Sequence, residues 1–345
     1  MILLLQVDFG IAWKWEYDND FVNILDRVCQ QYNIQSYIIH KDNLEETKDK
    51  LHSGDIRFNS FLDRASDEDE DFISFIKSIK EECCNCWFLN DSYHSVKSCD
   101  KSIMHFELAN AGINVPRTVI LPPFQEKPGL DLSGIEELGT PFIIKPAVTS
   151  GGGIGVVKDA KTEQDIEYER KSNPESCYLL QQHISPACLD DKRAWFRAYY
   201  VLNKVLICWW DDQTHIYNSL TEEDEKRFDL HELRTITQRI GRISRLDFFS
   251  TEIALDTSGR FIAIDYINDI CDMRLKSKHY DGVPDEKVFE ITGHLVNGVR
   301  KRIYPVEKIR EPRHIDSSLS RLGSFFSIFS KNIAGRLIYF FKRKK

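Results

Sequence analysis

A cluster of glycines directly after an apolar segment is the feature that most restricts the fold of this chain. Phe142–Pro146 has the character of a buried strand and carries Lys145 near its end. Thr149–Gly155 follows, with four glycines in five consecutive positions. A backbone without β-carbons lets its N–H groups close over phosphate oxygens, and a lysine neutralises their charge. The order therefore predicts a triphosphate-binding loop, with cofactor-binding candidates Ser150, Gly151, Gly152 and Gly153.

The order of these residues excludes two common phosphate motifs. A P-loop needs its lysine after the glycines, followed by Ser or Thr at the start of a helix, whereas Lys145 precedes them. The dinucleotide fingerprint needs a final glycine spacing and a helix that Gly151–Gly155 lacks. Taken alone, the loop is equally consistent with a flexible turn beside a surface lysine.

Two β-rich segments near the C-terminal end form a predicted hairpin. Phe248–Asp256 and Arg260–Asn268 are joined through Thr257–Gly259. If the turn is centred between Ser258 and Gly259, Glu252 faces Asp265. Two opposed carboxylates repel unless a divalent cation lies between them, and oxygen ligands near phosphates favour magnesium.

The hairpin is therefore a predicted metal site, with Glu252 and Asp265 as ligands. Asn268 is a weaker third ligand, because its side chain needs a bulge or a strand end to turn toward the same place. The alternative is that these acids lie on a solvated sheet face.

Lysine, glycine loop, paired acids and asparagine, in this order, resemble the ATP-grasp superfamily, of the carboxylate-amine ligase type found in glutathione synthetase and ribosomal-protein glutamate ligase. The segment from Lys101 to Thr118 is similar to another motif of that superfamily. The resemblance extends over residues from about 100 to 305. It implies two subdomains that hold a nucleotide between two antiparallel sheets.

The resemblance also implies roles for individual residues. Lys101 and Lys145 are the nucleotide lysines, and the cofactors are ATP and Mg²⁺, with Mn²⁺ as an alternative. The hinge strand that pairs with adenine contains Gln181, Gln182, His183 and Ile184. Arg197 matches the catalytic arginine that opens the next strand, and Glu252, Asp265 and Asn268 match the metal ligands.

This sequence departs from the family pattern at three points. Gln182 replaces the usual acid of the hinge, and two residues rather than one separate Asp265 from Asn268. Trp195 stands two residues before the arginine, where an acid is common. Asp191 or its neighbour Asp190 is a candidate for binding ribose, with a turn cap as the alternative.

The second substrate is expected near the segment from Arg197 to Tyr217. Trp209 and Trp210 point to opposite faces of a strand, so at most one lines a pocket. After Asn268 comes a loop in which Arg274 is a second catalytic candidate, since a cation there could hold a carboxylate or phosphate. A plain surface loop is an equal alternative.

Length and charge agree with this interpretation. A chain of 345 residues with 42% hydrophobic content can bury more than one core. Its net charge of −8 gives no support for a nucleic-acid binder. Nine cysteines without a secretory signal are typical of a cytoplasmic protein with reduced thiols. The apolar start lacks a basic flank and is interpreted as a first buried strand.

The predicted fold is mixed α/β (α+β), in three parts. Residues 1–97 form an N-terminal α/β lobe, residues 98–310 the ATP-grasp domain, and residues 311–345 a tail. In the lobe the patterns predict strands at 2–7, 36–40, 57–62 and 86–89 and helices at 20–33, 43–52 and 70–83. A further helix is expected near 221–245.

The tail has the pattern of a basic amphipathic helix. Apolar residues recur at three- and four-residue spacing from Leu319 to Phe341, and Lys331, Arg336 and a terminal run of lysines and arginine interrupt or follow them. Residues 317–345 could bind the enzyme's own surface, a protein partner, or the inner face of an anionic membrane. A homo-oligomer is also left open.

The predicted activity is that of an ATP- and magnesium-dependent ligase. It would join a small-molecule or peptide carboxylate to an amine through an acylphosphate, forming a C–N bond. A kinase of the same fold and a non-catalytic ATP-binding scaffold are the alternatives. No nucleic-acid partner is expected.

Overall fold

The computed structural model describes residues 4–130, 132, 134–148 and 153–305 of the chain. Residues up to Ile303 belong to one compact unit, which contains all of the elements named below. The predicted amphipathic tail helix lies outside the described residues, as do Ser150, Gly151 and Gly152 of the predicted phosphate loop. No helix in the described part of the chain is both long enough and apolar enough to span a bilayer.

The N-terminal lobe is a parallel sheet in the order β2-β1-β3-β4. Its strands are β1 (Leu5–Trp13), β2 (Ser36–Ile39), β3 (Ile56–Arg64) and β4 (Trp87–Leu89). The connecting helices are α1 (Asn19–Gln31), α2 (Leu44–Ser53) and α3 (Glu70–Glu82). The predicted alternation of strands and helices is confirmed, and most boundaries agree within two residues.

The position of the first strand was predicted wrongly. The apolar start suggests 2–7, whereas the described strand begins at Leu5 and continues to Trp13. Gly10 in its middle weakens the strand pattern in the sequence, but packing requires it. A β-carbon built there would lie 2.6 Å from the Phe61 ring and 2.7 Å from the Phe58 ring.

A four-stranded antiparallel sheet, which we call the small sheet, has the order β5-β8-β6-β7. Its strands are β5 (Thr118–Leu121), β6 (Phe142–Pro146), β7 (Val157–Ala160) and β8 (Tyr178–Gln182). Helix α6 (Glu163–Ser172) packs on it through Ile166, which joins Phe142, Ile144 and Leu180 in one apolar core. Helix α6 therefore covers this face of the small sheet.

A five-stranded antiparallel sheet, the large sheet, has the order β13-β12-β11-β14-β15. Its strands are β11 (Trp195–Val201), β12 (Lys204–Trp210), β13 (Tyr217–Ser219), β14 (Phe248–Leu255) and β15 (Phe261–Asn268). A short hairpin of β9 (Cys188–Leu189) and β10 (Lys192–Arg193) precedes it. The helix expected near 221–245 is two helices, α7 (Glu222–Arg227) and α8 (Glu232–Ser244).

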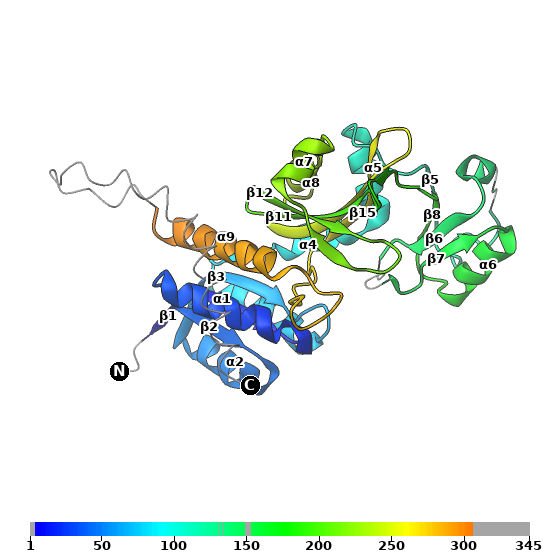
Figure 1. Ribbon diagram of the computed structural model, residues 1–345. Coiled ribbons are helices and arrows are strands. Elements are labelled where there is room, and N and C mark those ends of the chain that lie inside the picture. Colours follow the sequence, from blue (N-terminus) through cyan, green and yellow to red (C-terminus); the bar gives the residue numbers. More distant parts are fainter. Residues whose placement is uncertain (1–3, 131, 133, 149–152, 306–345) are drawn as a thin grey trace, which may run out of the picture. The chain divides into compact units, whose positions relative to one another are not determined.

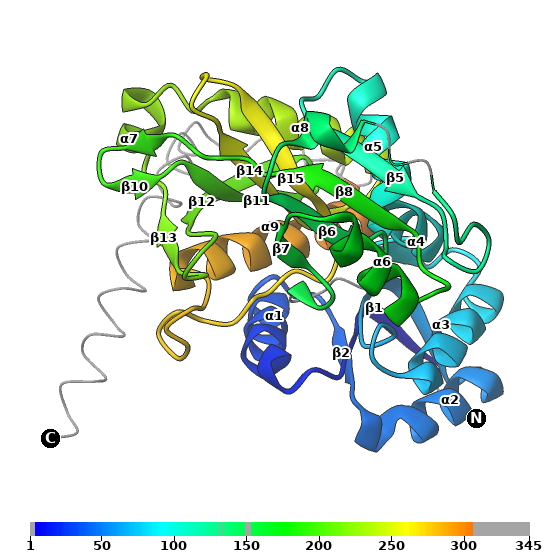
Figure 2. The ribbon, with the colours of Figure 1, turned by 90° about the vertical axis from the view of Figure 1, so that its right-hand side faces the viewer.

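Helices cover the large sheet unequally. On one face Phe196, Ala198 and Tyr200 pack against apolar side chains of α8. On the other face α9 (Asp285–Ile303) covers Tyr199 and Val201, in a core that continues into the N-terminal lobe. Figure 1 shows the large sheet between α7 and α8 above and α9 below, with the small sheet beside it, and Figure 2 shows the two sheets from the side of the small sheet.

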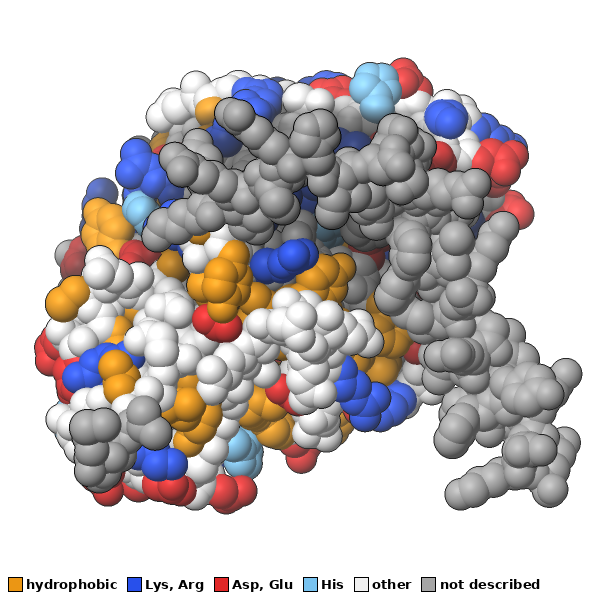
Figure 3. Space-filling model, turned by 90° about the vertical axis from the view of Figure 1, so that its left-hand side faces the viewer, with side chains coloured by type: hydrophobic (Ala, Val, Ile, Leu, Met, Phe, Trp, Pro, Cys, Tyr) orange, Lys and Arg blue, Asp and Glu red, His pale blue; other side chains and the backbone are white. Residues whose placement is uncertain are grey.

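One face of the molecule carries charged side chains of both signs. On the visible part of the face shown in Figure 3, Lys and Arg side chains and Asp and Glu side chains are scattered among apolar and uncharged ones. A nucleic-acid interface usually presents a basic field of one sign. This distribution agrees with the acidic net charge of −8.

Candidate functional site

Two carboxylates face each other at the centre of the candidate site. Glu252 on β14 pairs with Asp265 on β15, as predicted. A regular hairpin does not produce this pairing. The pairs nearer the turn, such as Leu255 with Phe261, would place Glu252 opposite Ile264 if the same register continued along the strands. Register shifts on both sides of Glu252 move Asp265 into that place. A β-bulge, which re-aims a side chain locally, thus creates the pair.

Three cations surround these carboxylates. Arg197 on β11 is the cross-strand partner of Glu252, and its Nη2 lies 2.5 Å from Glu252 Oε1. The Nζ of Lys101 lies 3.6 Å from Asp265 Oδ1. The Nζ of Lys145 donates to the carbonyl of Ile264 at 3.1 Å. The residues predicted from widely separated parts of the sequence therefore meet in one place.

Local structure positions the two lysines. Lys101 is the first residue of α5 (Lys101–Asn110), and its backbone N–H donates to Ala147 O, just after β6, at 2.8 Å. Asp100 caps that helix by accepting from the N–H groups of Ser102 and Ile103. Lys145 extends from β6 and lies 5.4 Å from the centre of the Tyr266 ring. The strand end and the helix start thus aim both ammonium groups between the sheets.

The charges of the cluster are unbalanced toward the positive. Burial lowers the pKa of Lys145 to about 8, against the attraction of Asp265. Burial disfavours the charged form of Asp265, but Lys101, Lys145 and Arg197 outweigh it and lower its pKa. Burial raises the pKa of Glu252, against the attraction of Arg197. Three cationic side chains around two carboxylates leave a positive excess that suits a polyphosphate.

The donor set fits magnesium held jointly with a nucleotide. Among the described residues there is no cluster of three or more His, Cys, Asp or Glu side chains that could hold a metal ion without other ligands. Magnesium is usually bound through one or two carboxylates together with substrate phosphates. Asn268, at the end of β15, pairs in register with Ser250, two residues before Glu252 on β14.

The predicted hinge strand is β8, and its side chains have structural partners. The amide Nε2 of Gln181 is buried and donates to Tyr266 Oη at 2.9 Å and to Thr118 Oγ1 at 3.0 Å. Tyr266 Oη also contacts His105 Nδ1 at 2.8 Å. This network fixes the Tyr266 ring beside Lys145. Tyr266 and His105 were not predicted, because aromatic and histidine side chains in apolar segments give no distinctive pattern.

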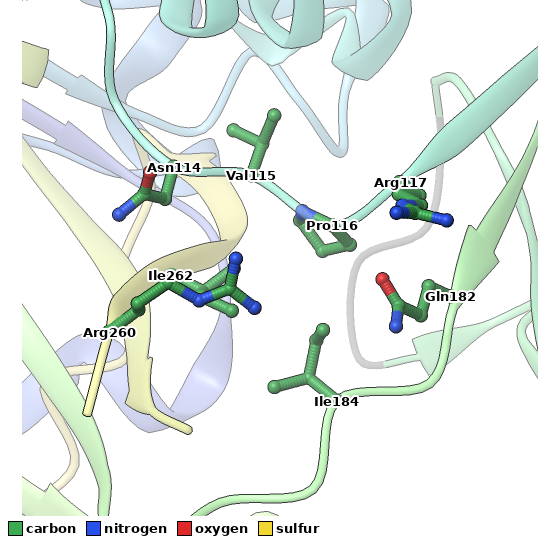
Figure 4. A pocket seen from close by; sticks show the side chains of 8 residues that line it. All are labelled: Asn114, Val115, Pro116, Arg117, Gln182, Ile184, Arg260 and Ile262. Carbon is green, nitrogen blue, oxygen red and sulfur yellow. The ribbon is translucent and has the colours of Figure 1, made fainter. Parts of the chain in front are cut away.

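A cavity of about 280 Å³ lies where the chain leaves β8. Gln182 and Ile184 from the hinge line it, and so do Ile262 and Arg260 from the large-sheet hairpin. Figure 4 shows these two pairs facing each other, with Pro116 and Arg117 closing another side. Apolar Ile184 and Ile262 thus line it together with the polar groups of Gln182 and Arg260. His183 lies between the two hinge residues.

Two predicted residues are not part of the charged cluster. Asp191 lies exposed in the turn between β9 and β10, where its neighbour Asp190 pairs with Arg227 at 3.0 Å. Arg274 is held between Asp272 and Asp281, at 2.8 and 3.0 Å. In the part of the chain that the structure describes, neither forms a hydrogen bond or ion pair with Lys145, Glu252 or Asp265. Gly153, the one candidate cofactor-binding glycine among the described residues, has φ +80°, and Gly155 of the same loop has φ +72°.

The two neighbouring tryptophans lie on opposite faces, as predicted. Trp209 is buried at 3% exposure in the core that packs on α8. Trp210 is partly exposed on the other face, and the Arg197 guanidinium lies 4.7 Å from its ring centre. Only Trp210 therefore contacts the charged cluster.

Comparisons with known proteins agree on the fold. No protein-family model matches the sequence, and no curated protein matches it. The ATP-grasp ligase PsnB, complexed with precursor peptide PsnA2 and AMPPNP, has a similar structure, with TM-score 0.57 and 14% identity over 86% of this chain and 99% of PsnB. D-alanine–D-alanine ligase from Bacillus anthracis complexed with ATP gives TM-score 0.59 and 13% identity over 86% and 98% of the two chains.

A RimK domain ATP-grasp protein from Sphaerobacter thermophilus is similar to the same extent. Its TM-score is 0.58 at 17% identity, over 84% of this chain and 98% of that chain. These similarities extend over most of every chain compared and show that this chain has the ATP-grasp fold. The predicted ATP-grasp fold is confirmed.

Proposed function

We propose that this chain of ATP-grasp fold is an ATP- and Mg²⁺-dependent ligase that joins a carboxylate to an amine or similar nucleophile. The observation that carries the proposal is the meeting of Lys101, Lys145 and Arg197 around the Glu252–Asp265 pair. Such a cluster can bind a metal-bound triphosphate and stabilise charge that develops during phosphoryl transfer.

The proposed binding mode uses both sheets. The base lies at the hinge, near Gln182 and Ile184, where backbone groups at the end of β8 can pair with it. The phosphates extend toward Lys145 and Lys101. Glu252, Asp265 and Asn268 hold Mg²⁺, which neutralises the phosphate oxygens when bound.

The proposed reaction has two steps. An oxygen of the substrate carboxylate attacks the γ-phosphorus of ATP, the bond to the bridging oxygen breaks, and ADP leaves with the bonding electrons. An amine then attacks the acyl carbon, phosphate leaves, and the amine loses a proton. Arg197 and Lys101 neutralise charge in the first step, so the protein acts by positioning and electrostatics without a nucleophilic side chain.

The similar structures support this proposal at the level of reaction class. PsnB is an ATP-grasp ligase whose structure contains a precursor peptide, and D-alanine–D-alanine ligase is named for a small-molecule reaction. Peptides and small molecules therefore both remain candidate substrates for this chain. Arg197 is the better candidate for contacting a substrate carboxylate, because it lies in the cluster with Glu252, whereas Arg274 is held by Asp272 and Asp281 outside it.

Product analysis tests the proposal. The full chain is incubated with ATP, Mg²⁺ and pooled amino acids or peptides, and products are identified by mass spectrometry and a phosphate assay. A ligase releases free phosphate together with a new amide mass. A phosphorylated metabolite without free phosphate would instead establish a kinase, and unchanged ATP in the presence of bound nucleotide would establish a binding scaffold.

A further inference from the structure

Trp195 occupies a position at which the family pattern favours an acid, and the structure gives it a partner. It lies on β11 two residues before Arg197, and both side chains lie on the same face of the large sheet. Its indole Nε1–H donates to Glu252 Oε2 at 3.1 Å. Arg197 Nη2 binds the other oxygen, Oε1, at 2.5 Å. Both oxygens of one predicted metal ligand are therefore held by β11.

The register explains how this contact forms. Arg197 faces Glu252 directly across the two strands, and Trp195 faces Ala254. A diagonal pair of this kind is separated by about 7–8 Å, which only a long or aromatic side chain spans. Ala254 is small and leaves room for the indole to reach back to Glu252. Trp195 is 8% exposed, so water does not compete strongly for its N–H.

We propose that Trp195 is a positioning residue that, with Arg197, fixes the orientation of the Glu252 carboxylate and thereby sets the metal affinity of the site. Each carboxylate oxygen can accept more than one bond, so each keeps capacity for a metal. Two donors from one rigid strand prevent rotation of the carboxylate. The inference rests on the proposed binding of a metal nucleotide at Glu252 and Asp265.

An acidic side chain at position 195 could not orient the Glu252 carboxylate in this way. A carboxylate near Glu252 would repel it and would compete for Arg197. A neutral donor orients Glu252 and leaves its charge for the metal. Outer partners of metal ligands commonly contribute about 10–100-fold to metal affinity.

The test replaces only the donor. Trp195→Phe keeps an aromatic ring but removes the N–H, and Trp195→His keeps a ring N–H on a smaller side chain. The matched control is Trp87→Phe, because Trp87 Nε1 donates to another carboxylate, Asp247 Oδ2, at 3.0 Å and belongs to the N-terminal lobe. Mn²⁺ binding to each full-length protein with AMPPNP is followed by electron paramagnetic resonance of the free ion. Binding of AMPPNP without metal is measured separately.

We expect Trp195→Phe to weaken Mn²⁺ binding by about 10–100-fold, with Trp195→His intermediate and Trp87→Phe unchanged. Metal-free AMPPNP affinity should stay nearly constant in all variants. Equal Mn²⁺ affinity in wild type and Trp195→Phe would overturn the positioning role while leaving the proposed function in place. Equal losses in the Phe and His variants would also overturn it, since packing would then be the cause. A wild-type protein that binds no Mn²⁺ with AMPPNP would contradict the proposed function itself.

Discussion

Lys145 shows how one buried residue can make a site sensitive to pH. Burial, together with the charge of Lys101, lowers its pKa to about 8 against the attraction of Asp265. A free Lys has a pKa of about 10.4, so it is charged throughout the neutral range. In this site Lys145 loses its charge within a physiologically accessible range of pH.

We therefore predict that affinity for ATP falls as the pH rises through about 8. With a pKa of about 8, the protonated fraction of Lys145 falls about tenfold between about pH 7 and about pH 9, so ATP affinity should fall by at most about 10-fold over this range. Isothermal titration from about pH 7 to about pH 9 measures the change. Lys145→Arg should flatten the profile, because a guanidinium stays charged over this range. A wild-type affinity that does not change with pH would contradict the assignment.

The same shift has the opposite effect on the stability of the nucleotide-free protein. The pKa of Lys145 is lower in the folded than in the unfolded chain, so the unfolded chain binds more protons between about pH 8 and 10.4. Stability from this group therefore rises with pH in that window, while ATP affinity falls. The two trends distinguish a change at the site from general unfolding.

Asp265 is the residue whose charge the proposed metal site needs most. Asp265→Asn keeps its shape and removes its charge, so we expect turnover to fall by orders of magnitude with the fold intact. Steady-state assays report the turnover and circular dichroism reports the fold. Asp42→Asn is the control, since the Asp42 side chain is 93% exposed in the N-terminal lobe. Full magnesium-dependent activity of Asp265→Asn would remove the metal assignment.

At the scale of single elements, two helical glycines differ in what surrounds them. Gly241 in α8 faces the Tyr200 ring, and a β-carbon there would lie 2.6 Å from it. A β-carbon built at Gly293 in α9 would have no neighbouring atom within 4 Å outside its own helix backbone. Alanine is otherwise the better helix residue by about 0.5–1 kcal/mol.

The two alanine variants should therefore change stability in opposite directions. Gly293→Ala should raise the free energy of unfolding by about 0.5–1 kcal/mol. Gly241→Ala should lower it by about 1–3 kcal/mol, because Tyr200 stacks on Phe249 and has little room to move. Urea denaturation of both variants measures the effect. Stabilisation by Gly241→Ala would mean that Tyr200 relaxes freely.

The elements and the central pair could be predicted from the sequence, whereas the contacts that orient the site could not. Local patterns determine where β14 and β15 begin, and the repulsion of two opposed acids singles out Glu252 and Asp265. The bulge that pairs them depends on packing of the whole sheet. The Trp195 contact and the pairing of Arg274 with Asp272 and Asp281 depend on tertiary geometry, which no local pattern encodes.

At the scale of the compact unit, the N-terminal lobe and the large sheet share one core. Phe9, Phe21 and Leu25 of the lobe belong to the same buried cluster as Phe248 of β14 and Leu295 of α9. A buried ion pair strengthens this junction. Arg64 Nε and Nη2 bind the two oxygens of Asp18 at 2.7 Å, and Nη2 also donates to Cys271 O at 3.0 Å. Cys271 follows the candidate metal ligand Asn268 by three residues.

Asp18→Asn tests this connection, because it leaves the Arg64 guanidinium buried without its counter-charge. Both side chains are almost inaccessible, at 1% and 0% exposure. Removing one partner of such a pair typically costs about 3–5 kcal/mol. The matched control is Asp20→Asn, whose partner Lys278 is 53% exposed, and we expect about 0–1 kcal/mol there. Because one core joins the lobe to the large sheet, fluorescence and circular dichroism should report a single coincident unfolding transition for both variants. Separate transitions would show that the lobe folds independently of the sheet that carries Glu252, and equal losses in the two variants would contradict the larger contribution expected of the Asp18–Arg64 pair.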